Sequence, residues 1–112
     1  MSEVPSITLR GAAPHTANMA RIMPDGSLEV ELFDFSPEAH QWLGNDVAYI
    51  VRVSPQDAPA VAARLLGQPA PSPLPVQAVL AAIQSRFAGY YEFLAWLDSE
   101  HIPYAKDFDG RA

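Results

Sequence analysis

The sequence of 112 residues contains no cysteine, so neither a disulfide nor a thiolate-bound zinc ion can hold the fold. It also lacks an apolar run of the roughly 18 to 20 residues that a membrane-spanning helix needs. Residues 1–5 do not have the composition of a secretory signal. From these absences we expect a cytoplasmic protein, not bound to a membrane, whose single domain is stabilised by packing alone.

Sequence signatures of catalysis are missing as well. The six glycines never cluster, so no phosphate-binding loop is expected. No serine lies in the context of a catalytic nucleophile, and no second histidine stands at ligand spacing from His40. We therefore expect a protein that is not an enzyme and that uses no cofactor and no metal ion.

Lysine and arginine are absent between residues 25 and 46, although this stretch contains six acidic residues. The six are Asp25, Glu29, Glu31, Asp34, Glu38 and Asp46. Outside it, seven acidic residues are balanced by seven basic ones, so the net charge of −6 arises from this stretch. Such a field attracts basic proteins and repels the phosphates of nucleic acids, which favours a basic protein partner and disfavours nucleic acid. An ordinary solvated surface explains the same pattern equally well.

A β-hairpin is predicted in the middle of this stretch. Residues 28–32 alternate between apolar and charged side chains, as a half-buried strand does. The Pro-Asp-Gly sequence at 24–26 predicts a three-residue hairpin loop, because proline suits the first turn position and glycine accepts a positive φ. This loop places Arg21 opposite Glu29, whereas a two-residue turn would pair Arg21 with Val30 and mix the faces.

Further strands are predicted on either side of the hairpin. Residues 47–53 are apolar on one face and mostly apolar on the other, which is typical of a central strand. A Ser-Pro pair at 36–37 and Gly44 predict a short helix before that strand. Residues 1–16 are expected to form either a flexible arm or an edge strand through residues 7–9.

The second half of the chain has apolar residues at helical spacing. The predicted helices run from Ser54 to Gly67, from Val76 to Gly89, and from Tyr90 to Glu100. A stiff proline-rich connector is expected at 68–75, and residues 104–108 form either a final strand or a docked tail. The sequence therefore predicts an α+β fold in which residues 17–112 form a small, mainly antiparallel sheet of three to four strands, packed against two to three C-terminal helices.

Four aromatic residues are candidate binding anchors as well as candidate core residues: Trp42, Tyr90, Tyr91 and Trp96. Of these, Trp42 is expected to be the most exposed, because it lies in the short acidic segment.

The order of these segments resembles that of small bacterial proteins, some of which look like immunity proteins of polymorphic toxin systems. The resemblance covers roughly residues 17–108. It is carried by the acidic strand at 28–35, the Gly-Asn-Asp-Val-Ala-Tyr run at 44–49, the Ser-Pro-Gln-Asp start at 54–57 and the aromatic helix end at 93–104. It implies a protein that occludes a toxin and needs no active site of its own.

The leading hypothesis is therefore a non-enzymatic, immunity-type inhibitor whose acidic face covers a basic site on a toxin. Its predicted contact residues are Glu29, Glu31, Asp34, Glu38, Trp42 and Asp46. One alternative is a small metal-dependent or acid–base enzyme centred on His40, Asp34 and Asp46. Another is a structural accessory protein that forms a homodimer through its apolar helical stripe, so both a monomer and a homodimer stay open.

Overall fold

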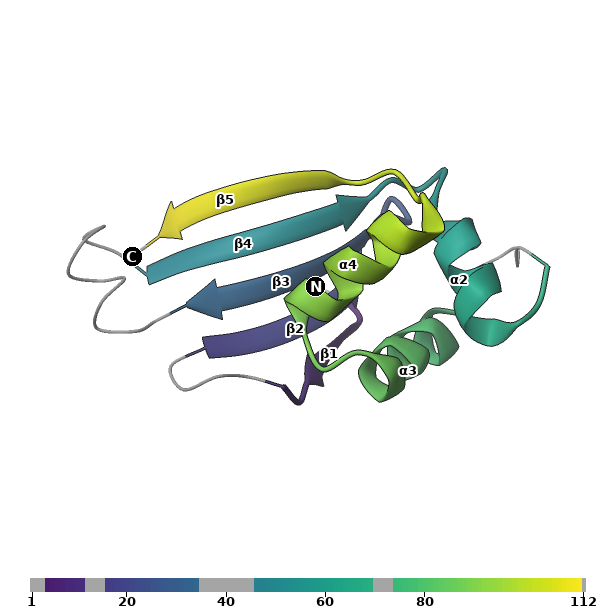
Figure 1. Ribbon diagram of the computed structural model, residues 1–112, viewed down its shortest axis with the longest axis horizontal. Coiled ribbons are helices and arrows are strands. Elements are labelled where there is room, and N and C mark those ends of the chain that lie inside the picture. Colours follow the sequence, from purple (N-terminus) through teal and green to yellow (C-terminus); the bar gives the residue numbers. More distant parts are fainter. Residues whose placement is uncertain (1–3, 12–15, 35–45, 70–73, 112) are drawn as a thin grey trace.

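The computed structural model describes residues 4–11, 16–34, 46–69 and 74–111, including all side chains in these ranges except those of 46–47 and 108–111. Within this part the chain forms a five-stranded antiparallel sheet in the order β1-β2-β3-β4-β5 (Figure 1). The strands are β1 (Ser6–Leu9), β2 (Thr16–Ile22), β3 (Leu28–Asp34), β4 (Asp46–Val53) and β5 (Ala105–Arg111). The helices are α2 (Ala58–Leu66), α3 (Val76–Arg86) and α4 (Tyr90–Glu100).

The predicted α+β fold is confirmed, with five strands in place of three or four. Of the two alternatives for each end of the chain, residues 6–9 form an edge strand and residues 105–111 form the final strand. The predicted helix at 37–43 lies outside the described residues, as do Glu38, His40, Trp42 and part of the connector. No helix in the described ranges has the length and apolar character to cross a membrane.

The hairpin between β2 and β3 has the predicted three-residue loop. The N–H of Gly26 donates to the carbonyl of Met23 at 2.9 Å, and Gly26 has a φ of 92°, a conformation that glycine adopts without steric cost. The resulting register places Arg21 opposite Glu29. The local sequence therefore determined both the turn and the side of the sheet on which each residue of β3 lies.

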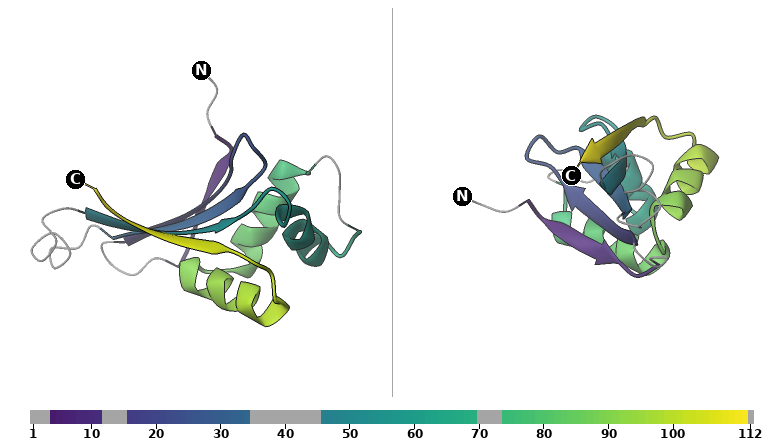
Figure 2. Two further views of the ribbon diagram at one scale, coloured as in Figure 1. Left: turned by 90° about the horizontal axis from the view of Figure 1, so that it is seen from above. Right: turned by 90° about the vertical axis from the view of Figure 1, so that its left-hand side faces the viewer.

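The three helices of the described part of the chain are inserted between β4 and β5, which are neighbours in the sheet. Figure 2 shows these helices on one side of the curved sheet, while the other side carries no helix from the described part of the chain. We call this second side the open face. The buried core lies between sheet and helices, and its largest fully buried side chains are Phe93, Leu9, Leu28, Leu80, Ile83 and Leu97.

The helix boundaries follow from local stop and start residues. Gly67 adopts a left-handed conformation with a φ of 68° and ends α2, as predicted. The α2 helix starts at Ala58, later than the Ser-Pro pair suggests, because residues 55–57 form a turn in which the Ser54 hydroxyl accepts the N–H of Asp57. The predicted break near Gly89 separates α3 from α4.

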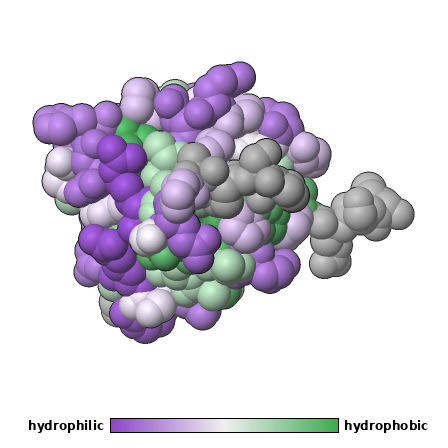
Figure 3. All heavy atoms as spheres, turned by 90° about the vertical axis from the view of Figure 1, so that its right-hand side faces the viewer, coloured by the Kyte–Doolittle hydropathy of each residue, from purple (hydrophilic) through white to green (hydrophobic). Residues whose placement is uncertain are grey.

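The apolar stripes of the helices face the chain's own core. Val61 and Ala62 of α2 and Leu80 and Ile83 of α3 are almost completely inaccessible to solvent. The end of the molecule where α2 and α3 lie shows polar residues interspersed with small apolar areas (Figure 3). The stripes that suggested a homodimer are therefore used within a single chain.

Candidate functional site

The acidic residues Glu29 and Glu31 lie on the open face and are paired with arginines. Glu29 is only 4 % exposed and accepts hydrogen bonds from Arg21 Nε at 3.1 Å and Arg52 Nε at 2.7 Å. Glu31 accepts one from Arg21 Nη1 at 3.2 Å. This ladder of two acids and two bases spans β2, β3 and β4 and has no net charge. Its carboxylates are already paired with arginines of the same chain, which weakens their attraction for a partner.

Asp34 lies on the opposite side of the sheet from Glu29 and Glu31. Side chains alternate between the two faces of a strand, so residues 29 and 31 face one way and residue 34 the other. Asp25 belongs to the hairpin loop at the far end of β3, where its carboxylate accepts the N–H and the hydroxyl of Ser27. The expected single acidic face is therefore wrong for Asp34, whereas Asp25 lines one hollow together with Glu29 and Arg52. The side chains of Glu38, Trp42 and Asp46 lie outside the described ones.

A cleft lies on the helix side, where the start of α4 meets the ends of β2, β3 and β4. We call it the tyrosine cleft and define it by six lining residues: Leu32, Asp34, Tyr49, Tyr90, Tyr91 and Glu92. Its volume is about 360 Å³ and it opens to solvent. It combines two carboxylates with three phenol rings, one from β4 and two from α4.

A contact between distant parts of the chain builds the wall of this cleft. The N–H of Tyr90, at the first position of α4, donates to Asn18 Oδ1 of β2 at 2.9 Å in a buried environment. This amide oxygen takes the place of a local N-cap, since Gly89 has no side chain. A Cβ on Gly89 would lie 2.7 Å from Asn18 Oδ1, so glycine is needed for this approach.

The linker between α3 and α4, residues 87–89, is also held by hydrogen bonds at Ala88. The N–H of Gly11 donates to the carbonyl of Ala88 at 2.8 Å, and a Cβ on Gly11 would lie 2.4 Å from the Ala88 Cβ. The N–H of Ala88 donates to Glu92 Oε1 at 2.9 Å. These bonds fix the direction in which α4 starts, and hence the positions of Tyr90 and Tyr91.

The three tyrosines form a connected cluster. The ring centroids of Tyr49 and Tyr90 are 6.5 Å apart with planes inclined by 52°, and those of Tyr90 and Tyr91 are 5.2 Å apart and nearly perpendicular. Burial raises the pKa of the Tyr90 phenol above its ordinary value, because the charged phenolate is poorly solvated there. Tyr91 is 65 % exposed and is the large hydrophobic residue most open to solvent among those described.

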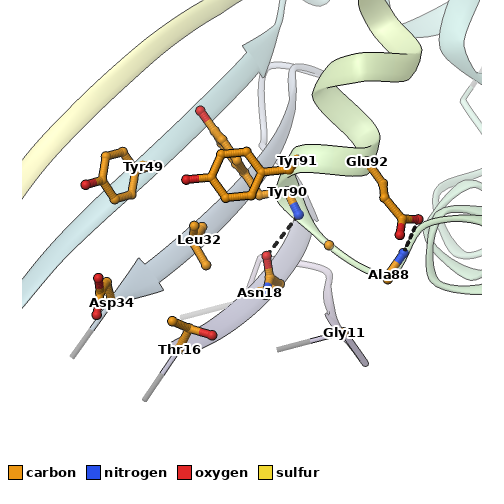
Figure 4. Close-up of a pocket in the computed structure, with 11 residues that line it drawn as sticks. Gly11, Thr16, Asn18, Leu32, Asp34, Tyr49, Ala88, Tyr90, Tyr91 and Glu92 are labelled. Carbon is orange, nitrogen blue, oxygen red and sulfur yellow. Dashed lines mark hydrogen bonds between the residues drawn. The ribbon is translucent and has the colours of Figure 1, made fainter. Parts of the chain in front are cut away.

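Figure 4 shows how the side chains lie in the cleft. Tyr90 and Tyr91 reach from the start of α4 toward Tyr49, and Asp34 lies at that same end, at the tip of β3. Glu92 is turned to the other end, toward Ala88. A second hollow of similar volume, about 360 Å³, shares the three tyrosines and adds Leu94, Lys106 and Asp107.

The sequence predicted some of these residues as binding anchors but not others. Tyr90 and Tyr91 were candidate anchors, and their burial separates them into a wall residue and an exposed one. Trp96, another candidate, is 8 % exposed and packs against Phe87 and Phe93 in the core. Tyr49 was expected only as a strand residue, and its place near Asp34 follows from the pairing of β3 with β4.

The described side chains contain no group of three or more histidine, aspartate or glutamate residues arranged to hold a metal ion. The alternative site of His40 and Asp46 with Asp34 falls on side chains outside the described set, apart from Asp34. In comparisons with known proteins, no family model, curated protein or solved structure matches this chain.

Proposed function

We propose that this chain is a non-enzymatic binding protein that holds a basic partner protein, in the manner of an immunity-type inhibitor, and that the tyrosine cleft lies at the centre of the contact. The observation that carries the proposal is the 65 % exposure of Tyr91 at a cleft that also contains the Asp34 carboxylate. An exposed aromatic ring beside a hollow is characteristic of an interface anchor.

The geometry of Tyr91 supports this role. Its ring packs nearly perpendicular to that of Tyr90, which is itself buried and anchored through its backbone to Asn18. A ring held in this way loses little conformational freedom when a partner covers it. The cleft is therefore organised for binding before a partner arrives.

The charge distribution supports a basic partner. The net charge of −6 speeds the approach of a positively charged protein, and the Asp34 and Glu92 carboxylates lie at opposite ends of the cleft. The sequence predicted Glu29 and Glu31 as contacts for the partner, but this proposal does not place them in the contact. Their arginine partners neutralise them, so they stabilise the sheet on the face away from the cleft.

An affinity experiment with matched variants tests the proposal. The immobilised protein is used to capture proteins from its source cells, and each captured protein is then purified and its binding measured by calorimetry at two salt concentrations. We expect a basic partner whose affinity falls at least tenfold with Tyr91→Ala and falls again at higher salt.

Glu31→Gln is the control, because it removes one negative charge from the same strand on the opposite face and should change the affinity less than Asp34→Asn does. The proposal fails if the source cells yield no basic protein whose binding depends on Tyr91. It also fails if Glu31→Gln weakens binding as much as Asp34→Asn.

A further inference from the structure

The tyrosine cleft has the size of a site for one long side chain. Its volume of about 360 Å³ lies at the lower end of the range for small-molecule pockets, roughly 300–1,000 Å³. It is open to solvent on one side, so a side chain projecting from another protein can enter without any displacement of α4. A partner can therefore place a single residue in it while the rest of the interface forms around the rim.

The walls of the cleft suit a side chain with an apolar stem and a flat, charged end. Leu32 and the rings of Tyr49 and Tyr90 supply apolar surface near the base of the cleft, against which a chain of methylene groups can pack. The ring of Tyr91 adds an exposed aromatic surface beside them. A planar cation stacks on such a surface, and the contact gains strength where water is partly excluded.

The position of Asp34 favours a positive charge at the tip of the inserted side chain. Its carboxylate lies at the end of the cleft toward which Tyr90 and Tyr91 reach, whereas Glu92 lies at the other end and accepts the Ala88 N–H. A cation that stacks on Tyr91 at that end of the cleft is attracted by the negative charge of Asp34. An anionic side chain would be repelled by both carboxylates.

On the basis of the proposed function, we infer that the tyrosine cleft is an arginine pocket, in which one arginine of the basic partner stacks its guanidinium on Tyr91 and pairs with Asp34. Lysine fits less well, because its ammonium group is compact and strongly hydrated and cannot stack as a plane. A neutral side chain of the same shape would gain the stem contacts but not the ion pair.

Three small probes test this inference in the intact protein: N-acetyl-arginine amide, N-acetyl-lysine amide and N-acetyl-citrulline amide. Citrulline has nearly the shape of arginine but carries no charge. Each is titrated into nitrogen-15-labelled protein, and the backbone amide signals are followed by NMR. We expect the arginine probe to shift the amide signals of Asp34, Tyr90 and Tyr91 and to saturate with a Kd on the order of millimolar, as its small size dictates. The lysine probe should bind at least threefold more weakly, and the citrulline probe at least tenfold.

Variants of the cleft separate stacking from charge. Tyr91→Phe keeps an aromatic face and should bind the arginine probe within about twofold of the unaltered protein, since cation–π attraction needs only the ring. Tyr91→Leu keeps apolar bulk without a π face and should bind at least threefold more weakly. Asp34→Asn should remove most of the preference for arginine over citrulline, whereas Glu31→Gln, on the opposite face, should leave that preference intact.

The inference is overturned if citrulline binds as well as arginine, if the shifts spread over the surface without saturating, or if Tyr91→Leu has no effect. Tyr91 is exposed, so its variants are expected to fold, and their dispersed amide spectra would show it. The two proposals fail separately. Arginine binding in the cleft without a Tyr91-dependent partner would remove the proposed function alone. A Tyr91-dependent partner without arginine binding would remove only the arginine pocket.

Discussion

The buried bond between Asn18 and the start of α4 makes a quantitative prediction about coupled mutations. Asn18→Ala leaves the Tyr90 N–H buried without an acceptor, and an orphaned buried donor costs about 1–3 kcal/mol. For a domain of this size, that loss lowers the unfolding midpoint by roughly 4–12 °C. Gly89→Ala should cost about the same, because its Cβ would lie 2.7 Å from Asn18 Oδ1 and would push the amide out of hydrogen-bonding position.

The double variant distinguishes this mechanism from two unrelated defects. Once Asn18 is alanine, the amide that obstructs a Cβ at residue 89 is gone. The backbone of Gly89 is extended, with a φ of −172°, so alanine is not strained there. Gly89→Ala should then cost nothing, or stabilise by about 0.4–1 kcal/mol through a less flexible unfolded chain. We therefore expect a coupling energy of about 1–3 kcal/mol between the two sites.

Equilibrium unfolding in urea, followed by circular dichroism, measures the four free energies of this cycle, provided that the slopes of the four transitions agree. Asn18→Asp is a useful companion, because it retains an acceptor oxygen at the same place and should recover part of the loss. If the costs of Asn18→Ala and Gly89→Ala add to within about 0.5 kcal/mol, the two residues do not act through a shared contact. The described construction of the cleft wall would then be refuted.

Two further predictions concern the ionic ladder and the tyrosines. Glu29→Gln should destabilise the protein by about 1.5–3 kcal/mol, because Glu29 is buried between two guanidinium groups. Glu31→Gln should cost under about 1 kcal/mol. Equal losses of unfolding free energy in urea would contradict this assignment. Burial raises the pKa of Tyr90, and the hydrogen bond from its hydroxyl to Asp98 raises the pKa of Tyr104, so both phenols keep their protons more firmly in the folded state than in the unfolded one. The stability that these two phenols contribute should be complete at pH values below 10.0, the ordinary pKa of tyrosine. It should be lost as the pH rises through the higher pKa values that the two phenols have in the folded protein. Absorbance titration of Tyr90→Phe and Tyr104→Phe checks this, and identical phenol titrations of folded and urea-unfolded protein would count against it.

Features that depend on neighbouring residues could be read from the amino-acid sequence. The Pro-Asp-Gly loop specified the hairpin and its register, and with it the pairing of Arg21 and Glu29. Gly67 and the break near Gly89 specified where helices end. These features were predictable because turn conformation, glycine φ and strand alternation act over a few residues. The same alternation also placed Asp34 on the face opposite Glu29, although the clustering of acids along the chain suggested one surface.

Contacts between distant residues became visible only in the folded chain. Asn18 and Tyr90 are 72 residues apart, and no local pattern marks one as the cap of the other's helix. Tyr49 comes beside Tyr90 because β3 pairs with β4 in one particular register and the α3–α4 linker is anchored on Gly11. The pairing of Arg52 with Glu29 depends on the same register. Such contacts are set by how the helices pack across the sheet, and packing depends on the shapes of surfaces that exist only once the chain has folded.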